Sequence, residues 1–413
     1  MKILLVHNRY QQPGGEDTVF NQERELLESA GHQVFTYCRS NCEIGNCTGL
    51  KRLPLAVQMV WARDTRREIA NILAWQKPDL VHIHNTFLMV SPSIYAACKE
   101  ARVPVVQTLH NYRLFCPAAN FFRAGQVCEE CVERNLWRSI QHACYRDSRS
   151  QTAGVAFMLK MHRMLRTGST MVDTYVPLTE FARRKFIACG VPAEKTVTKP
   201  NFVHPDPGPR RSACDYALFI GQLSAGKGPE TLLQAWSRLS VRASLRIIGD
   251  GPLRSRLEAG THGQARDIYF EGQVSRSQVL AALKSGRFLV FPSRWYESFP
   301  MVIVEAFACG LPVIVSRLGA AQEIVEDGGT GLHFTPGDPD DLAAKVSWAW
   351  THSAEMAAMG RAARAEYEAK YTAQRNYQIL MGIYRGVLGT KTRAVDSRQQ
   401  HVAQTCSASS TAD

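Results

Sequence analysis

The sequence predicts an α/β protein with two Rossmann-like, doubly wound domains. A chain of 413 residues exceeds what one hydrophobic core usually serves. Short apolar strands alternate with helical stretches on both sides of residue 205, which is typical of parallel βαβ units. Between the two sets the chain reads Pro-Asp-Pro-Gly-Pro-Arg-Arg over residues 205–211. A run this rich in proline and glycine predicts an interdomain linker.

The N-terminal domain, residues 1–204, opens with an apolar run at residues 3–6. This run is too short for a signal peptide, and polar residues follow it without a small-residue cleavage site, so we expect a buried first strand. Gly14 and Gly15 separate this strand from a helix. A glycine pair there lets backbone N–H groups approach an anion at the helix N-terminus. An ordinary tight turn explains the pair equally well.

Two further strands are expected at residues 78–85 and 103–110. His110 closes the second, and the carboxyl ends of parallel strands are where open α/β sheets place their ligands. His82 and His84 alternate along the first strand, and we interpret them as structural.

A cysteine-rich loop is expected at residues 111–150, where periodicity is weak. It contains Cys116, Cys128, Cys131 and Cys144. A Cys-x-x-Cys pair flanked by two further cysteines can supply four thiolates to a structural zinc ion. The alternative is four buried or loosely placed thiols without metal.

The C-terminal domain, residues 205–370, begins with a strand at 216–220 and a loop that contains Gln222 and Lys227. Lys227 directly precedes a predicted helix, a favourable position for contacting a phosphate. A later strand, at 245–248, ends in a glycine turn that contains Gly249.

Residues 288–315 form a strand–helix–strand unit. Pro292 ends the first strand, and Gly310 and Pro312 end the helix expected at 300–309. Glu297 lies in the loop before this helix and Glu305 in its interior. A buried carboxylate is costly unless hydrogen bonds are donated to it, which makes Glu305 a candidate site residue.

The stretch from residue 292 to 313 contains, in order, Pro-Ser, a loop glutamate, seven intervening residues, a helical glutamate and Ala-x-Ala-Cys-Gly-x-Pro-Val. This stretch resembles the signature of retaining glycosyltransferases of family four. The resemblance spans residues 1–388 and is most specific at 216–331. It implies the GT-B fold, in which two Rossmann-like domains face each other across a cleft. It also implies that the helical region expected from residue 354 to 388 crosses back to the first domain through residues 371–388. Residues 389–413 lack periodicity and are expected to be disordered.

The resemblance implies a nucleoside diphosphate sugar as donor and no catalytic metal. Lys227 would contact the diphosphate and Glu305 the ribose, while Glu297 and His110 would orient the sugar as the catalytic residues. The full donor-binding set implied is Gly14, Gly15, Gln222, Lys227, Gly249, Phe299, Met301, Val302 and Glu305.

Two positions depart from the family pattern. Gln222 stands where the family usually has arginine, and Pro300 where it usually has glycine. Proline has no N–H to donate, so Met301 would have to supply that backbone contact. These departures leave open a second interpretation, a non-catalytic protein that binds nucleotide sugars or glycans. A nicotinamide oxidoreductase is excluded because no dinucleotide fingerprint follows a strand.

The formal charge of +12 is uneven. Residues 1–205 hold 26 Lys and Arg against 17 Asp and Glu, or +9, and the remainder holds 23 against 20, or +3. This excess, with a partly amphipathic helix predicted at 51–67, indicates an anionic membrane surface or an anionic acceptor. The family resemblance implies a saccharide or a polyprenyl-diphosphate-linked saccharide as acceptor, and the basic N-terminal half suits the latter. A solvated basic face is the alternative, and no motif indicates nucleic acid. Without a predicted membrane span, we expect a cytoplasmic protein that is peripheral to the membrane. The family resemblance implies a role in cell-surface polysaccharide synthesis.

Overall fold

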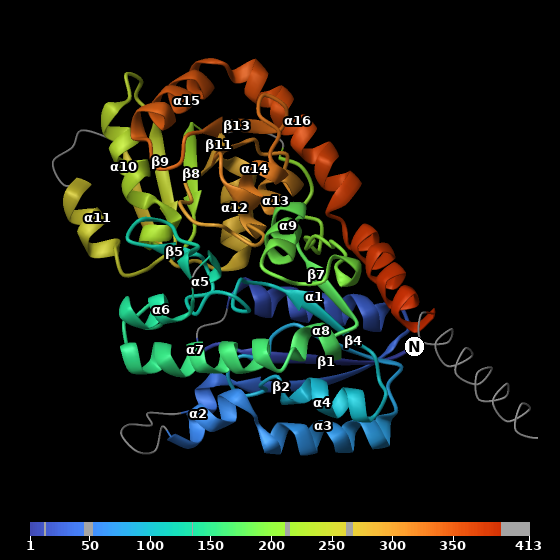
Figure 1. Cartoon of the computed structure of the whole chain (residues 1–413). Coiled ribbons are helices and arrows are strands. Elements are labelled where there is room, and N and C mark those ends of the chain that lie inside the picture. Colours follow the sequence, from blue (N-terminus) through green and yellow to red (C-terminus); the bar gives the residue numbers. More distant parts are fainter. Residues whose placement is uncertain (12–13, 45–52, 134, 211–214, 262–266, 390–413) are drawn as a thin grey trace, which may run out of the picture.

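The computed structural model describes residues 1–11, 14–44, 53–133, 135–210, 215–261 and 267–389 (Figure 1). The tail that we expect to be disordered lies outside these ranges, except for Gly389. Two separate parallel sheets, each covered by helices, form the two halves of the molecule. The fold is therefore α/β with two Rossmann-like domains, as the sequence predicts.

The N-terminal sheet has the strand order β2-β1-β3-β4-β7, with all neighbours parallel. Its strands β3 and β4 are buried along their whole length, because helices cover both faces of the sheet. The elements of this half, apart from those between residues 111 and 148, are β1 (Lys2–Arg9), α1 (Gly15–Ser29), β2 (Gln33–Ser40), η1 (Asn41–Ile44), α2 (Leu53–Val60), α3 (Arg63–Gln76), β3 (Leu80–Ile83), α4 (Ser93–Glu100), β4 (Val105–Leu109), α7 (Arg149–Met164), α8 (Thr167–Met171), β7 (Thr174–Pro177), α9 (Glu180–Ala188) and η3 (Ala193–Lys195).

The C-terminal sheet has the order β10-β9-β8-β11-β12-β13 and is also parallel throughout. The strand order reverses direction at β8, and the loops after β8 and β11 therefore lie beside each other at one edge. The elements of this half are β8 (Tyr216–Ile220), η4 (Ala225–Lys227), α10 (Pro229–Arg238), β9 (Ser244–Ile248), α11 (Arg254–Thr261), β10 (Ile268–Gly272), α12 (Arg276–Ser285), β11 (Phe288–Phe291), α13 (Met301–Ala308), β12 (Val313–Ser316), α14 (Gly319–Ile324), β13 (Gly331–Phe334), α15 (Pro339–Thr351) and α16 (Ser353–Lys370).

The end of the chain returns to the N-terminal half. After α16, residues 373–389 form a second helix, so the single helical region expected at 354–388 is interrupted at residues 371–372. Leu380 and Tyr384 of this last helix are buried against Ile3 and Leu5 of β1. The returning helix is thus part of the N-terminal hydrophobic core.

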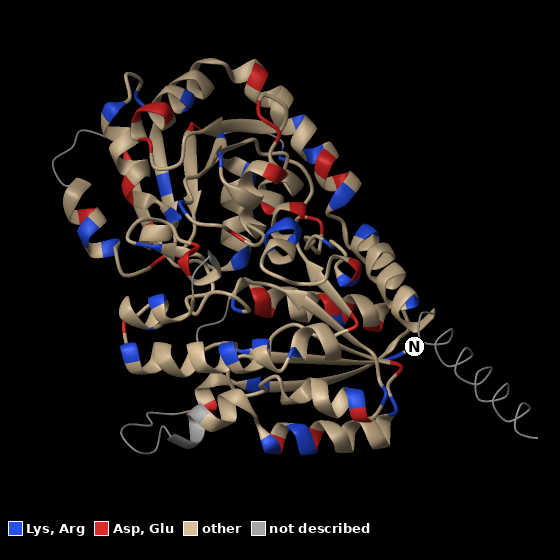
Figure 2. Ribbon diagram, viewed as in Figure 1, with Lys and Arg blue, Asp and Glu red and all other residues tan. Residues whose placement is uncertain are grey.

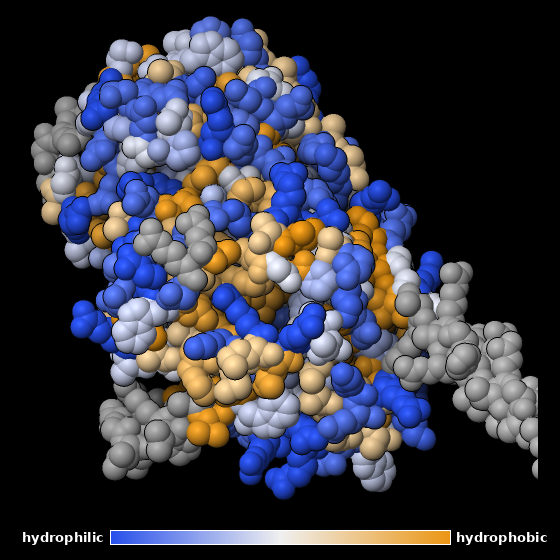
Figure 3. Space-filling model, viewed as in Figure 1, coloured by the Kyte–Doolittle hydropathy of each residue, from blue (hydrophilic) through white to orange (hydrophobic). Residues whose placement is uncertain are grey.

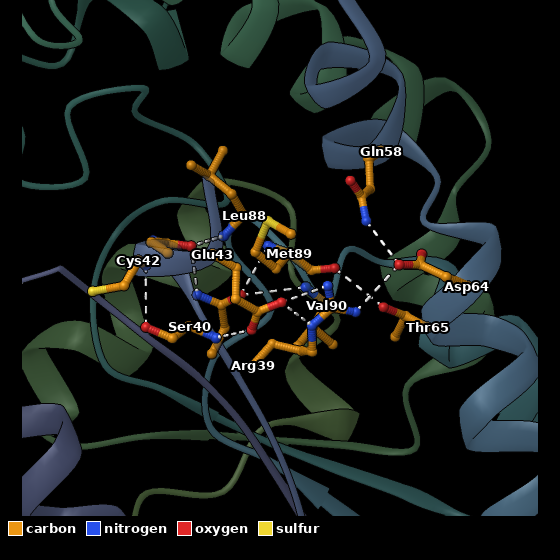
Figure 4. Close-up of polar contacts among 12 residues, drawn as sticks. Arg39, Ser40, Cys42, Glu43, Gln58, Asp64, Thr65, Leu88, Met89 and Val90 are labelled. Carbon is orange, nitrogen blue, oxygen red and sulfur yellow. Dashed lines mark hydrogen bonds and ion pairs between the residues drawn. The ribbon is translucent and has the colours of Figure 1, made fainter. Parts of the chain in front are cut away.

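The helix predicted at 51–67 is two helices, α2 and α3, and residues 51–52 lie outside the described chain. The break at Ala62 is fixed by tertiary hydrogen bonds, because its N–H donates to Ser91 Oγ (2.9 Å) and its carbonyl accepts from Ser93 Oγ (2.8 Å). Figure 4 shows Gln58 of α2 and Arg39 of β2 both directed at Asp64, in the first turn of α3. These long-range contacts are invisible to local periodicity.

The cysteine-rich segment is more regular than the sequence predicts. It contains a short antiparallel hairpin, β5 (Phe122–Arg123) and β6 (Gln126–Val127), followed by α5 (Glu130–Glu133) and α6 (Trp137–Gln141). Strands of two residues and helices of four or five are too short to establish a repeat, which is why this loop-rich segment shows little periodicity.

Candidate active site

Three donors converge on one carboxylate oxygen of the loop between β11 and α13. Glu297 Oε1 accepts from Lys227 Nζ (2.6 Å), Trp295 Nε1 (2.6 Å) and Ser293 Oγ (3.0 Å). Charge-assisted hydrogen bonds of this kind are stronger than neutral ones, so the loop is held in a defined shape. The structure therefore joins two predicted site residues, Lys227 and Glu297, and adds two that sequence reasoning missed.

Two glycines allow Lys227 to reach this loop. A side chain on Gly226 would collide with the Trp295 ring, at 2.2 Å from its nearest atom. Gly228 has φ +70°, and a Cβ there would lie 2.0 Å from the Pro292 carbonyl oxygen. The η4 turn is thus pressed against the end of β11, which places the Lys227 ammonium at the edge of the sheet, directly before α10.

Glu305 lies on α13, the helix that follows the loop bearing Glu297. Its nearest charged partner is the Arg276 guanidinium at 3.8 Å, and burial raises the pKa of its carboxyl group. Pro300 is the N-cap of α13 and Phe299 is buried beside the Tyr371 ring, at 6.0 Å between centroids. Met301 and Val302 form the first, partly exposed turn. Glu305 is partly buried, and its carboxylate can accept hydrogen bonds from hydroxyl groups.

Gly249 and Gln222 lie in adjacent loops at the ends of β9 and β8. Gly249 has φ +140°, and a Cβ there would lie 2.0 Å from the Gly221 carbonyl oxygen, so only glycine fits. Gln222 is exposed, one residue after that carbonyl. Its neutral side chain leaves Lys227 as the cation of this loop.

His110 follows β4 directly and is buried. Its Nε2 lies 3.0 Å from His84 Nδ1, and the two rings stack. Burial, together with the neighbouring His84 and His7 rings, lowers the pKa of His110 well below its usual value, so the ring is neutral near pH 7. His84, which we predicted to be structural, is the residue that holds His110 in place. No contact between described residues joins His110 to Glu297.

Gly14 is the N-cap of α1, and Gly15 is its first residue. Both are exposed, and the Gly14 N–H donates to Asp17 Oδ2 (2.8 Å). This helix N-terminus lies next to His110 in space, because Asn111 donates to Glu16 Oε1 (2.7 Å). Sequence reasoning missed Glu16 and Asn111, since neither residue type stands out alone.

The two halves of the molecule meet at these loops. The Phe122 ring of the hairpin contacts Trp295 edge-on at 5.9 Å, and Phe181 of α9 contacts Tyr296 at 4.9 Å. Glu323 of α14 accepts hydrogen bonds from the first two N–H groups of α9. Burial and the Glu297 carboxylate both raise the pKa of Tyr112, two residues after His110. The loops that bear His110 and Glu297 are thus neighbours across the interface.

The four cysteines interact with one another. Burial and the Cys116, Cys144 and Cys128 thiols raise the pKa of Cys131 to about 12. All four are free thiols, and Cys116 and Cys131 are buried. Their sulfurs are not drawn into a tight cluster: among the described residues, only Glu23, His82 and His84 bring three metal-ligating atoms within 4.8 Å of one another.

That buried triad already has a cation beside it, although Glu23 Oε1 and His84 Nε2, which lie 3.3 Å apart, have no hydrogen-bond partner among the described residues. Lys199 Nζ already lies 2.8 Å from Glu23 Oε2 and supplies the positive charge. The two ring nitrogens of His82 lie within hydrogen-bond distance of Tyr384 Oη (2.7 Å) and Thr108 Oγ1 (2.8 Å). The group is a buried ion-pair network. Its member His84 contacts His110, so the network supports the position of His110.

Two family models match the chain. "Glycosyl transferase 4-like domain" matches residues 14–201, and "Glycosyl transferases group 1" matches residues 207–366. The chain is 25% identical over 329 residues to the sulfoquinovosyl transferase SQD2 of Arabidopsis thaliana, covering 78% of this chain and 58% of that protein. It is 31% identical over 169 residues to the D-rhamnosyltransferase WbpZ of Pseudomonas aeruginosa, covering 40% and 42%. The chain therefore spans less than two thirds of the length of these relatives.

Among solved structures, Anabaena Alr3699/HepE in complex with UDP has a TM-score of 0.64 to this structure, with 19% identity, and the match covers 93% of this chain and 99% of the other. At this identity the likeness concerns the fold alone. The family models account for both halves, and the two parallel sheets match the architecture of that neighbour. The chain belongs to the group 1 glycosyltransferases and has the GT-B fold.

Proposed function

We propose that the protein transfers a sugar from a nucleoside diphosphate sugar to a hydroxyl group of a saccharide or lipid-linked acceptor, with retention of anomeric configuration. The observation that carries this proposal is the convergence of Lys227, Trp295 and Ser293 on Glu297 beside the N-terminus of α10. An ammonium and a helix N-terminus together favour a diphosphate leaving group. UDP in the HepE structure supports a nucleotide donor.

In this proposal each site residue has one role. Lys227 releases Glu297 when the diphosphate arrives, and the freed carboxylate accepts hydrogen bonds from the sugar. Glu305 accepts from the ribose hydroxyls, and neutral His110 faces the sugar from the other half. Backbone groups supply the remaining donor contacts, at Gly14, Gly15, Gln222, Gly249, Phe299, Met301 and Val302.

The test is a panel of UDP-, GDP- and ADP-linked sugars with the purified protein. We expect release of the nucleoside diphosphate from one of these donors and a product, identified by NMR, with the donor's anomeric configuration. Binding of a donor without any turnover would favour the alternative, a non-catalytic glycan- or nucleotide-sugar-binding protein. An inverted product would contradict retention.

A cavity of about 440 Å³ in the N-terminal half supports an amphiphilic acceptor. It lies between α7, α8 and the loop after β4, and its walls include Phe115, Met158 and Leu159. Arg163 lines it and donates to the Phe115 carbonyl oxygen (3.2 Å). Neither Arg163 nor Arg166 pairs with a carboxylate in the described part of the chain, so both are available to an anionic head group. Such an acceptor suits cell-surface polysaccharide synthesis at the membrane.

The surface around this cavity predicts salt-sensitive membrane binding. On α7, Phe157 and Met164 are 56% and 69% exposed. Figure 2 shows Lys and Arg residues along the same helix, and Figure 3 shows apolar and polar surface side by side over this part of the N-terminal half. No described helix is long and apolar enough to cross a membrane. We expect the protein to co-sediment with vesicles that contain phosphatidylglycerol and to dissociate as salt is added, because salt screens exposed charges beyond about 8–10 Å.

Matched variants make this test specific. Arg163→Gln combined with Arg166→Gln should weaken vesicle binding up to about thirtyfold, because each basic residue near an anionic surface contributes about 1 kcal/mol. Arg256→Gln, on α11 of the other half, should leave binding unchanged. Equal sedimentation with pure phosphatidylcholine vesicles would contradict an electrostatic membrane contact.

We also propose that Cys116, Cys128, Cys131 and Cys144 bind one structural zinc ion. Their mutual electrostatic influence indicates that they share one region, and a bound ion would draw the thiolates together. We expect about one zinc per chain after purification under reducing conditions, and Cys128→Ser should release it and lower transfer. Because the hairpin contacts Trp295, the loss would act through the donor loop. Four freely titrating thiols in metal-free, fully active protein would contradict this.

A further inference from the structure

Glu16 is a buried acid beside the candidate site that the donor-binding roles leave unused. It lies in the first turn of α1, just beyond the end of β1, and sequence reasoning assigned roles only to the two glycines before it. Glu16 as a residue is partly exposed, yet its Oε2 atom is buried and has no hydrogen-bond partner among the described residues. A buried acceptor left unpaired is costly, and such a group in a native site needs an explanation.

The other oxygen of Glu16 is held firmly. Asn111 Nδ2 donates to Glu16 Oε1 (2.7 Å) and also lies 3.2 Å from Tyr10 Oη. Asn111 in turn is fixed, because its Oδ1 accepts from the Arg113 backbone N–H (3.0 Å). The carboxylate is therefore anchored through Oε1 by the residue that directly follows His110, and Oε2 is left without a partner among the described residues.

Helix capping does not account for Glu16. That role belongs to Asp17, whose Oδ2 accepts from the Gly14 N–H (2.8 Å) and whose Oδ1 lies 3.0 Å from His7 Nε2. Nor does a salt bridge account for it. The nearest cation, Arg113, donates to the Pro117 carbonyl oxygen and stacks on the Phe87 ring at 4.3 Å. Glu16 makes no ion pair in the described part of the chain.

We propose that Glu16 is an acceptor-binding residue, with Oε2 accepting a hydrogen bond from the hydroxyl group that receives the sugar. This rests on the proposed function and extends it to the acceptor side of the site. Asn111 is the positioning residue, and its neighbour His110 contacts the donor sugar, so donor and acceptor are held by one stretch of chain. The hydrogen bond removes the unpaired buried oxygen, which makes acceptor binding favourable.

The charge of Glu16 responds to pH in the physiological range. Burial raises its pKa to about 7, although the Asn111 hydrogen bond and the Arg113 charge oppose this. The groups that face it are Tyr10 after β1, Asp17 on α1, and Asn111 and Arg113 after β4. Only the carboxylate, present above that pKa, is a strong acceptor for a hydroxyl group. Acceptor use should therefore improve as pH rises through about 7.

The test compares Glu16→Gln with Glu16→Asp and with the control Glu25→Gln, an exposed acid on the same helix. Glycerol serves as the probe acceptor, with the donor identified by the nucleotide-sugar panel. We expect Glu16→Gln to lower kcat/KM for glycerol at least about tenfold, and Glu16→Asp to restore part of it. The affinity for the nucleoside diphosphate and the KM for the donor should stay within about twofold, because Glu16 contacts neither. The wild-type to Glu16→Gln ratio should grow between about pH 6 and pH 8.

A Glu16→Gln variant with wild-type kcat/KM for glycerol and a ratio independent of pH would overturn the proposal. So would a ¹³C-carboxyl titration of Glu16, assigned by comparison with Glu16→Gln, with a midpoint near the ordinary value of about 4.3. Loss of nucleotide binding in Glu16→Gln would also overturn it, because the role would then be structural or on the donor side. Failure of the proposed function looks different: wild-type protein would use no donor at all, while the carboxyl titration would still report on Glu16.

Discussion

Replacing Lys227 by alanine is expected to lower sugar transfer at least about tenfold, which corresponds to about 1.4 kcal/mol of transition-state stabilisation. Lys227 is the cation of the β8–α10 loop, with Nζ 2.6 Å from Glu297 Oε1. Because Gln222 is neutral, no second charge in this loop compensates for its loss. The ammonium is also preorganised against the Trp295 ring, at 5.5 Å from the centroid. Preorganised charge contributes most when negative charge develops on the leaving diphosphate.

Steady-state kinetics with the active donor would measure this effect, and Glu305→Ala should give a comparable loss through a raised donor KM. Lys370→Ala is the matched control, since the side chain of this lysine is 59% exposed on α16 and, among the described residues, its one ion pair is with Glu366. Its kcat/KM should be that of the wild type. Correctly folded Lys227→Ala and Glu305→Ala variants that transfer sugar at near-normal rates would place the donor elsewhere.

The strand–helix–strand unit around these residues was predictable from sequence. The strands predicted at 288–291 and 313–315 are present as β11 (Phe288–Phe291) and β12 (Val313–Ser316). The helix predicted at 300–309 is present as α13 (Met301–Ala308), one residue shorter at each end. Strands of a parallel sheet are buried on both faces, so each appears as a continuous apolar run. Glycine and proline mark the helix end locally. These signals require no knowledge of the rest of the chain.

The contacts inside the site were not predictable in this way. Trp295 and Ser293 bind Glu297 because the loop folds back on itself, and Glu16 meets Asn111 across 95 positions of sequence. The Ala62 break between α2 and α3 depends on Ser91 and Ser93, about thirty residues away. Such partners are selected by tertiary packing, which overrides local propensity. Sequence could indicate which edge of each sheet bears the site, but not which side chains share a hydrogen bond there.

The largest stability effect is expected at Glu23, in the buried network beneath His110. Glu23 and Lys199 are both fully buried, with Nζ 2.8 Å from Oε2, and they are separated by 176 positions in sequence. Glu23→Ala leaves the Lys199 ammonium with the neutral Asn376 Oδ1, at 3.3 Å, as its one remaining side-chain partner in the described part of the chain. Breaking a buried ion pair in this way costs about 3–5 kcal/mol, because the remaining charge is desolvated without compensation. Urea unfolding followed by circular dichroism should show this loss in the free energy of unfolding.

Two comparisons separate an ion-pair effect from a packing effect. Glu25→Ala, an exposed position on the same helix, should change the free energy of unfolding by no more than about 0.5 kcal/mol. Glu23→Leu combined with Lys199→Met should recover much of the loss, since replacing both charges by apolar groups removes the unpaired ammonium. If the double variant is as unstable as Glu23→Ala, the cost arises from packing around α1 and not from the uncompensated charge.

The effect of Glu23→Ala on the free energy of unfolding should also depend on pH. Burial alone would raise the pKa of Glu23, but the Lys199 ammonium and the His82 ring hold it well below its usual value. A carboxyl group with a depressed pKa in the folded state contributes stability above its unfolded pKa of about 4.3, and that contribution is lost as pH falls further. The free-energy difference between wild type and Glu23→Ala should therefore be constant near neutrality and shrink below about pH 4.

Burial also lowers the pKa of His84 to about 3, so the wild-type fold loses stability in acid from about pH 6.5 downward, where His84 protonates more readily in the unfolded chain. Between about pH 6.5 and pH 3 this protonation takes place in the unfolded chain, while folded His84 stays neutral and keeps its contact with His110.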